Sequence, residues 1–414
     1  MYTCNLEFYT AIGKFFYEKK SLLEKKILIS SGLFLTIIFS IIVVVLLILN
    51  KNVVLRYFFN DTVYTYEYYV SLIWLFLAAI GTYVGVIPRY NNQQKIFVVI
   101  STVSLFFRVG STVFFILVLH YGIAGVLYGH IVGSIISLLT NIYVTKKYIG
   151  LNIRWSEIKN IASFSFPLVP GVLLIGLWQP FSRDLISKYY SIKYIGLLSF
   201  AVRIASVLEI INYGIRFAWT PLLFENHEKE NFKTDLLKIS KIVGHLSFSS
   251  AIILTLISPE ICRYVGTPEY EKSTILIAFL AFTSVFEILK TIRGFGPLIL
   301  KKTYLLTLGE IGGICSALII IYLFSDSLGL FGIGLLFLIP SFLKYLFLSF
   351  YTQYKIKINL QENIEILYSI ILIISIALVY WNSSIIVRYF LVFIVAAHIM
   401  KKYLFSKGLI GKKE

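Results

Sequence analysis

The sequence predicts an all-α polytopic membrane protein with about twelve transmembrane helices in two lobes of parallel topology. Three observations predict this fold class. Apolar residues make up 58% of the chain and charged residues only 14%, which one soluble core cannot accommodate. The apolar residues fall into runs of about 20, the length that spans a bilayer as a helix. The chain also overlays on itself at an offset of 207 residues, which indicates an internal repeat.

The repeat rests on landmarks that recur at this one offset. The apolar stretch at 95–122 matches the one at 302–329, because each begins with Lys and ends with Gly. Residues 12–18 match residues 219–225, and both segments end in an aromatic residue followed by Glu. The second copy has two helices for which the first copy has no partner. We therefore expect two helices of the first copy to be missing.

The apolar runs place the helices in chain order. The first copy has spans at about 27–49, 67–87, 96–119 and 122–144. Two further spans follow at about 161–190 and 194–222. The second copy continues at about 236–258, 274–298, 303–324 and 329–350, and a hairpin ends the chain at about 365–381 and 384–404. We expect an N-terminal lobe over 1–150, a C-terminal lobe over 151–360, and the hairpin with a basic cytoplasmic tail over 361–414.

Lys and Arg gather in the loops on one side of these spans, which is typical of the cytoplasmic side. We therefore place both termini in the cytoplasm. The net charge of +17 is spread over these membrane-edge loops, so membrane lipids are the expected partner and nucleic acid is not. The three cysteines have no metal-ligand spacing. We expect no metal site and no cofactor.

Several segments carry a family resemblance. The runs FSFPLVP at 164–170, IGLLSFAVRIAS at 195–206 and WTPLLF at 219–224, with Ser182 and Arg183, resemble the seventh and eighth helices of Wzx-type polysaccharide flippases. The run AIGKFFYE at 11–18 resembles the end of that family's second helix. The family belongs to the multidrug, oligosaccharidyl-lipid and polysaccharide exporter superfamily. The resemblance covers nearly the whole chain.

The resemblance implies a carrier in the bacterial inner membrane that flips an undecaprenyl-diphosphate-linked oligosaccharide for O-antigen or capsule assembly. It implies fourteen helices in two lobes around a cationic cavity, with other polysaccharide-assembly proteins as further partners. The family's first helix and most of its second would precede Met1, in agreement with the two unmatched helices of the repeat. The family commonly has an Asp-Arg pair where this chain has Ser182 and Arg183, so an ion-pair role there is not carried over.

Ionisable residues inside the spans are the site candidates, because a charge at the bilayer centre costs about 3 kcal/mol and usually faces the protein interior. In the span 194–222, Glu209, Asn212 and Arg216 share one helix face, and Arg203 lies nearer the outer end. A guanidinium binds phosphate oxygens in two places at once. We expect Arg203 and Arg216 to face the anionic cargo. Alternatively, Arg216 neutralises Glu209 and Arg203 extends to the interface.

For each of the remaining polar candidates, the sequence is compatible with two roles. Arg183 contacts sugar or diphosphate at the outer mouth, or anchors the helix at the interface. Lys14 meets the diphosphate on entry, or is an ordinary cytoplasmic-side charge. His130 and His245, well inside spans, form interhelical hydrogen bonds, with a proton relay as the alternative.

A second set of in-span charges is expected to be structural or to control gating. Glu287 and Lys290 are three residues apart on one helix and can neutralise each other, with Arg293 one turn further on. Arg108 has no acid within one turn, so we expect its partner on another helix, with Glu310 as the candidate.

Proline and glycine mark the helix geometry. Pro167, Pro170 and Pro180 remove backbone donors from the span 161–190 and should kink or break it, which supplies a hinge for alternating access. Gly122, Gly125 and Gly129 with Gly133 form small-residue steps that let helices approach closely.

Three functional alternatives to a flippase stay open at this stage. A cation-coupled small-molecule exporter of the multidrug and toxin extrusion type would favour a buried carboxylate and few arginines. A truncated, inactive remnant would account for the unmatched helices. A membrane enzyme would need a large outer loop or an acidic cluster. The longest predicted outer loop, at about 50–66, is short, so we expect no catalysis.

Overall fold

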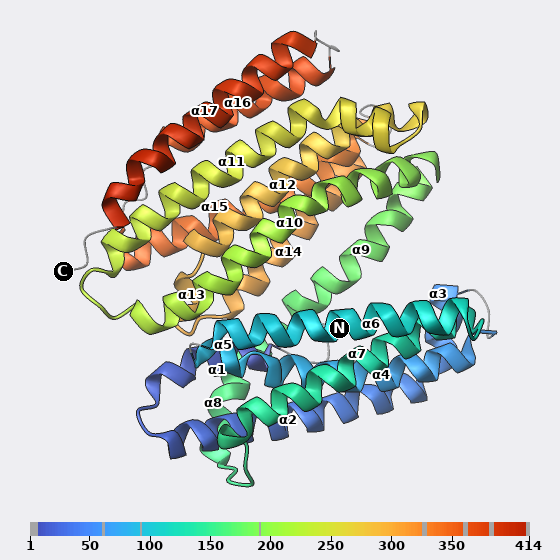
Figure 1. Ribbon diagram of the computed structural model, residues 1–414, viewed down its shortest axis with the longest axis vertical. Helices are drawn as coiled ribbons and strands as arrows, with labels where there is room; N and C mark the ends of the chain where they lie inside the picture. Colours follow the sequence, from blue (N-terminus) through green and yellow to red (C-terminus); the bar gives the residue numbers. More distant parts are fainter. Residues whose placement is uncertain are drawn as a thin grey trace. The chain divides into compact units, whose positions relative to one another are not determined.

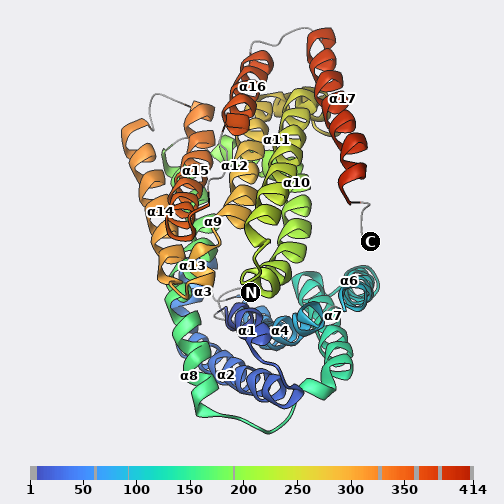
Figure 2. The same cartoon turned by 90° about the vertical axis from the view of Figure 1, so that its left-hand side faces the viewer.

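The computed structural model describes residues 7–59, 63–91, 93–189, 192–324, 329–358, 363–380 and 385–410, and within them the secondary structure is entirely helical (Figures 1 and 2). The chain divides into two compact units, unit 1 (Met1–Gly176) and unit 2 (Leu177–Glu414). The division falls inside α9 (Val169–Tyr189). The predicted lobe limits at 150 and 360 stay a prediction.

Unit 1 is built on helix α7, against which α4 and α6 both pack, while α2 packs against α4 and α8. Helix α2 begins with a capping box: the Ser21 hydroxyl accepts from the Glu24 N–H and the Glu24 carboxylate accepts from the Ser21 N–H, both at 3.2 Å. The elements are α1 (Phe8–Glu18), α2 (Leu22–Leu49), α3 (Lys51–Phe59), α4 (Thr65–Gly85), α5 (Ile87–Tyr90), α6 (Gln94–Leu117), α7 (Gly122–Thr145), η1 (Lys146–Tyr148), α8 (Trp155–Ser165) and η2 (Phe166–Leu168).

Unit 2 is built around helix α12, which packs against α10, α11 and α15. Helix α15 also packs against α14, and the terminal pair α16 and α17 lies against α11 (Figure 1). The elements are α10 (Ile192–Asn226), α11 (Phe232–Val265), η3 (Pro268–Lys272), α12 (Ser273–Arg293), α13 (Gly296–Ile299), α14 (Tyr304–Phe324), α15 (Gly329–Ile356), α16 (Asn363–Tyr380) and α17 (Ile385–Ile410).

The internal repeat is visible inside the two units. Helices α4, α6 and α7 of unit 1 correspond to α12, α14 and α15 of unit 2, and the pairs that pack together are the same. Helix α7 begins at Gly122 and α15 at Gly329, with positive φ angles of 54° and 50°. Glycine adopts this left-handed conformation without the steric penalty that a Cβ brings. The sequence offset of 207 therefore also appears as a glycine with positive φ at the first residue of equivalent helices.

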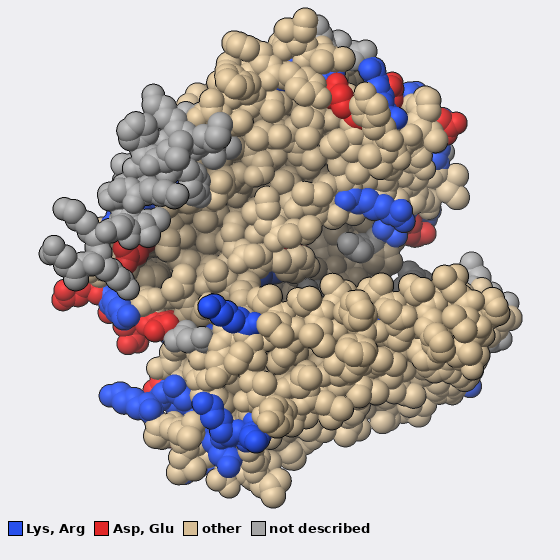
Figure 3. All heavy atoms as spheres, in the orientation of Figure 1, with Lys and Arg blue, Asp and Glu red and all other residues tan. Residues whose placement is uncertain are grey.

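Helix length and surface chemistry make this a multi-pass membrane protein. Ten helices in the described part of the chain are long and apolar enough to cross a bilayer. Two shorter apolar segments, Leu367–Tyr380 and Ile385–Ala397, lie where the terminal hairpin was predicted. Helix α2 leaves Ile41, Val45 and Leu49 exposed along one face. Figure 3 shows a broad uncharged face on unit 1, with Lys and Arg gathered at one end.

Helix α12 is buried around nearly its whole circumference. Leu276, Ala281 and Leu289 are 0% exposed and belong to the main apolar cluster of unit 2. A helix that is buried on all sides has no solvent face on which to place charges. The ionisable residues of α12 consequently lie inside unit 2 and need partners there.

The predicted span 161–190 is interrupted. It appears as α8, the single 3₁₀ turn η2 and α9. Pro167 lies in η2 and Pro170 in the first turn of α9, where neither offers a backbone N–H. Pro180 lies inside α9, which stays helical around it. Two of the three prolines thus accompany a break in the helix, and a hinge at this break stays a prediction.

Candidate functional site

The polar stripe of α10 is held against α12 through Glu209. The Asn212 side-chain amide donates to Glu209 Oε2 at 3.4 Å, and the Ser284 hydroxyl of α12 donates to Glu209 Oε1 at 3.4 Å. Asn212 is buried, whereas Arg216, one turn further, is exposed. Within the described residues, no ion pair joins Arg216 to Glu209. The alternative in which Arg216 neutralises Glu209 is therefore not the arrangement found.

Arg203 and Arg183 are also exposed. The backbone carbonyl of Arg203 accepts from the Ser206 hydroxyl at 2.6 Å, which leaves the guanidinium outside that interaction. Arg183 follows the buried Ser182 near the end of α9. In the part of the chain that the structure describes, neither guanidinium has a carboxylate within ion-pair distance.

Lys14 occupies a different environment from the arginines. Its side chain is 3% exposed, and its Nζ lies 3.5 Å from Glu18 Oε1, one helical turn away on α1. The structure thus places Lys14 in the interior of unit 1 with a carboxylate beside it. This setting favours a structural role over contact with a cargo headgroup.

Four charges from three helices form a closed network in unit 2, which we call the charge ring: Glu287, Lys290, Glu310 and Lys344. On α12, Lys290 Nζ lies 2.5 Å from Glu287 Oε2, which is the predicted contact at three residues' separation. Lys290 also lies 3.5 Å from Glu310 on α14. Lys344 on α15 lies 3.0 Å from a carboxylate oxygen of both Glu287 and Glu310. Each charge has two opposite neighbours, so the ring is neutral.

The ring corrects one sequence-based expectation. Glu310 is bound by two lysines of its own unit, so it is not available as the expected partner of Arg108. Arg108 is exposed on α6, and its Cβ lies over Gly133 of α7. Within the described residues of unit 1, Arg108 has no ion-pair partner. A long side chain on a lipid-facing helix can extend its charge toward an interface, which removes the need for an internal acid.

Arg293 joins three helices through side-chain hydroxyl groups. It is 3% exposed, and its guanidinium donates to the Ser240 hydroxyl of α11 at 2.7 Å and to the Tyr345 hydroxyl of α15 at 3.1 Å. Those contacts tie α12 to α11 and α15. Arg293 therefore acts as a structural cross-link in this state of unit 2.

Of the two histidines inside spans, one makes the predicted interhelical hydrogen bond. His245 Nδ1 lies 2.8 Å from the Tyr368 hydroxyl of α16. His130 instead packs against the ring of Trp74, with ring centroids 4.6 Å apart. The hydrogen-bond prediction is thus confirmed for His245, and among the described residues no partner meets His130 Nδ1.

Sequence reasoning missed two charged contacts. Lys344 is the only charged residue between 329 and 350, so its isolation in an apolar run was a usable signal. Arg388 on α17 is 2% exposed and bidentate with Glu260 of α11, at 2.7 and 3.2 Å. No spacing along the chain predicts that second pair, because its members are 128 residues apart.

Comparison with known proteins agrees with this architecture. Residues 19–275 match the model of a family described as polysaccharide biosynthesis protein. No curated protein matches the sequence. Among solved structures, the chain is similar to a mutant of the Vibrio cholerae MATE transporter VcmN, at 11% identity and a TM-score of 0.69 over 86% of this chain and 85% of that chain.

Two further solved structures are similar. A MATE protein in the straight conformation shares 16% identity, with a TM-score of 0.70 over 86% of this chain and 84% of that chain. A MOP superfamily transporter from Pyrococcus furiosus shares 15% identity, with a TM-score of 0.68 over the same shares of the two chains. At these identities the likeness establishes the fold, which is that of MATE-like transporters with two lobes.

Proposed function

Because the chain belongs to the polysaccharide biosynthesis protein family and has the fold of a membrane transporter, we propose that it flips a lipid-linked oligosaccharide across the cytoplasmic membrane. The cargo we propose is an undecaprenyl-diphosphate-linked glycan, turned from the cytoplasmic to the outer leaflet for assembly of a surface polysaccharide. Such a cargo joins a bulky anionic diphosphate to a neutral, hydroxyl-rich sugar chain. A carrier for it needs cations that its own carboxylates do not neutralise.

The observation that supports this proposal most directly is the state of the two arginines on α10. Most charges in the spans of unit 2 are used internally: the charge ring neutralises itself, and Glu260 holds Arg388. Arg203 and Arg216 lie in a candidate span, are exposed, and have no ion-pair partner among the described residues. Since an unpaired charge in a bilayer costs about 3 kcal/mol, their retention favours an anionic ligand.

The similarity to solved MATE transporters suggests a cation-coupled exporter as the alternative. In such an exporter, cation binding would depend on Glu209. Glu287 and Glu310 are each contacted by two lysines, which leaves them unsuited to bind a cation. Glu209 is contacted by the neutral donors Asn212 and Ser284. On this alternative, Glu209→Gln would abolish transport, whereas the flippase proposal expects Arg216 to be the more sensitive position.

The test is charge reversal on α10 in a strain whose surface glycan depends on this gene. We expect Arg216→Glu to lower glycan display at least tenfold while the abundance of the protein in the membrane stays normal. The substitution replaces a phosphate-binding donor with a carboxylate, which repels the phosphate groups of the cargo. Arg203→Glu should act in the same direction. Arg263→Glu is the matched control, since Arg263 is exposed on α11 and already paired with Glu271 at 2.8 Å. Normal display in the Arg216→Glu strain would rule out the cargo role of this residue.

A further inference from the structure

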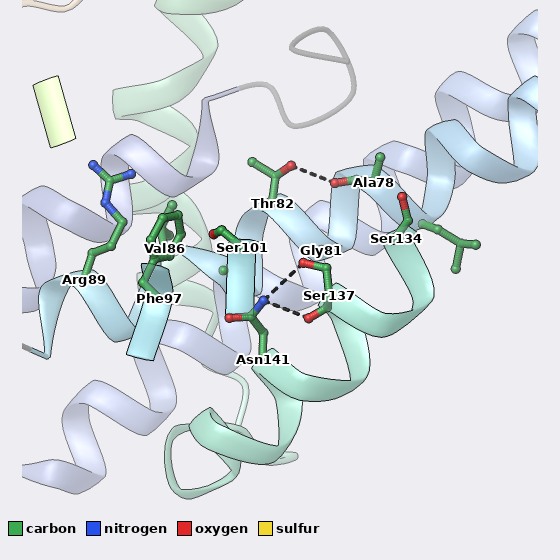
Figure 4. Close-up of a pocket in the computed structure, with 12 residues that line it drawn as sticks. Ala78, Gly81, Thr82, Val86, Arg89, Phe97, Ser101, Ser134, Ser137 and Asn141 are labelled. Carbon is green, nitrogen blue, oxygen red and sulfur yellow. Dashed lines mark hydrogen bonds between the residues drawn. The ribbon is translucent and has the colours of Figure 1, made fainter. Parts of the chain in front are cut away.

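A pocket lies among helices α4, α6 and α7 of unit 1, apart from the charges described above (Figure 4). It has a volume of about 240 Å³. The uncharged polar groups that line it are the hydroxyls of Thr82, Ser101, Ser134 and Ser137 and the side-chain amide of Asn141, with Phe97 and Arg89 also in its wall. No carboxylate is among its lining residues.

Helix packing explains why the space exists. Helices α4 and α6 each pack against α7, and the face that α4 turns to the pocket carries Ala78, Gly81 and Gly85. A Cβ added at Gly81 would meet no atom within 4 Å, and one at Gly85 would lie 3.7 Å from the Asn141 amide nitrogen. Small residues on α4 therefore keep the wedge between the helices open.

Asn141 gives the pocket a polar group that the protein leaves unused. The residue is 3% exposed, and its Nδ2 donates to the Ser137 carbonyl at 2.7 Å and to the Ser137 hydroxyl oxygen at 3.3 Å. Its Oδ1 is buried and has no hydrogen-bond partner among the described residues. Figure 4 shows this oxygen turned away from Ser137. A buried acceptor without a donor is unfavourable, so a ligand that donates there would bind with a gain in free energy.

In this wall a hydrogen-bond donor that is free lies beside an acceptor that is free. The Ser137 oxygen accepts from Asn141, which leaves its own O–H free to donate into the pocket, beside the free Asn141 acceptor. A ligand hydroxyl both donates and accepts, so it satisfies both groups. A cation would meet no carboxylate here. The side chain of Phe97 adds an apolar surface, with the Arg89 guanidinium 5.7 Å from its ring centroid.

The internal repeat indicates that this polarity is specific to unit 1. At the offset of 207 residues, Ser137 of α7 corresponds to Lys344 of α15. In unit 2 the same three-helix arrangement, α12, α14 and α15, holds the charge ring. At this one equivalent position, therefore, unit 2 has a charge of the ring where unit 1 has an uncharged hydroxyl in the wall of the pocket.

We propose that this pocket binds one sugar ring of the glycan cargo, an inference that rests on the proposed function. Its volume is below the roughly 300 Å³ at which drug-sized pockets begin, so it admits a single ring and not an oligosaccharide. Ligand hydroxyls meet Asn141 and Ser137, and the apolar face of the ring meets Phe97. The pocket therefore contributes selectivity for the sugar.

The test is direct binding of free monosaccharides to the purified full chain in lipid nanodiscs, read by saturation-transfer NMR. The probes are glucose, galactose, mannose, rhamnose, N-acetylglucosamine and N-acetylgalactosamine. Gly81→Leu fills the pocket from α4, and Gly110→Leu on α6 is its control, because a Cβ at Gly110 also meets nothing within 4 Å. We expect at least one sugar to bind the wild type and the Gly110→Leu variant, and binding to fall at least tenfold in Gly81→Leu.

A second variant keeps the test independent of folding. Asn141→Ala removes the acceptor without filling the pocket, and it should also weaken binding at least tenfold in protein whose thermal unfolding is cooperative. Absence of binding by all six sugars, or binding that both variants leave unchanged, would overturn the inference. Because this readout needs no transport, such a result leaves the flippase proposal standing. That proposal fails instead if Arg216→Glu leaves glycan display normal.

Discussion

At the residue scale, what separates the charges inside the spans is whether the protein supplies their partners. The charge ring alternates sign around four positions, and each carboxylate is contacted by two ammonium groups. Arg203 and Arg216 are exposed and have no such contact within the described residues. A neutralised charge stabilises helix packing, and an unneutralised one is available to a ligand or, as at Arg108, extends to the interface. This distinction supports a structural role for the ring and the binding role that we propose for Arg203 and Arg216.

Removal of one lysine from the ring should destabilise unit 2 more than removal of one lysine together with one of the carboxylates that it contacts. Lys344→Met leaves two carboxylates with one ammonium group in a part-buried site, which we expect to cost about 3 kcal/mol of unfolding free energy. The double variant Lys344→Met with Glu310→Gln leaves the neutral Glu287–Lys290 pair and should recover more than half of that loss. Thermal unfolding in detergent micelles measures both. Equal unfolding temperatures for the single and double variants would show that ring neutrality is unimportant.

How far the sequence predicts such contacts depends on the chain separation of the partners. Glu287 and Lys290 are predictable because residues three apart are neighbours on a helix. The contacts of Glu310 with Lys344 and of Glu260 with Arg388 depend on how distant helices pack, and no local pattern encodes that packing. Even so, a lone charge in an apolar run marks a residue that needs a partner. Only the identity of the partner requires the structure.

At the element scale, apolar runs predict where helices lie, and glycine and proline determine how they meet and break. The spans were predictable because a bilayer requires about 20 apolar residues, whereas the short helices α3 and α5 have no such signature. The break at η2 followed from Pro167, but the earlier start of α8 at Trp155 did not, because its sequence is only partly apolar. Between α6 and α7, the helices approach over Gly125, Gly129 and Gly133.

Because α6 and α7 approach so closely here, even the methyl group of alanine at position 129 should be too large. A Cβ at Gly129 would lie 2.8 Å from the backbone Cα of Thr112 on α6, so the two helices must separate. We expect Gly129→Ala to destabilise unit 1 by about 1 to 3 kcal/mol through overpacking. Gly110→Ala on α6 is the matched control, since its added methyl meets nothing within 4 Å. Thermal unfolding of the two variants in the same detergent compares them, and an equal effect would mean that α6 and α7 do not require this contact.

At the scale of the whole molecule, the internal repeat gives the two units the same arrangement of three helices, and the polar residues between those helices differ from one unit to the other. Gly122 and Gly329, both with positive φ, begin equivalent helices. The interiors differ because unit 2 placed opposite charges between its helices, while unit 1 kept hydroxyls and small residues around a cavity. The ring is neutral in itself, so we propose a role in binding for the cavity of unit 1 and not for the ring.

The orientation of the protein in the membrane determines from which side the cargo enters, and the loop charges predict this orientation. The loop between α7 and α8 carries Lys146 and Lys147, whereas the turn between α6 and α7 has no Lys or Arg, so we expect the first in the cytoplasm and the second outside. In a chain without its three native cysteines, His120→Cys should react with a membrane-impermeant maleimide in intact spheroplasts. Asn152→Cys should react only after permeabilisation. The reverse pattern would place the basic loops outside, and cargo would then enter unit 1 from the opposite face.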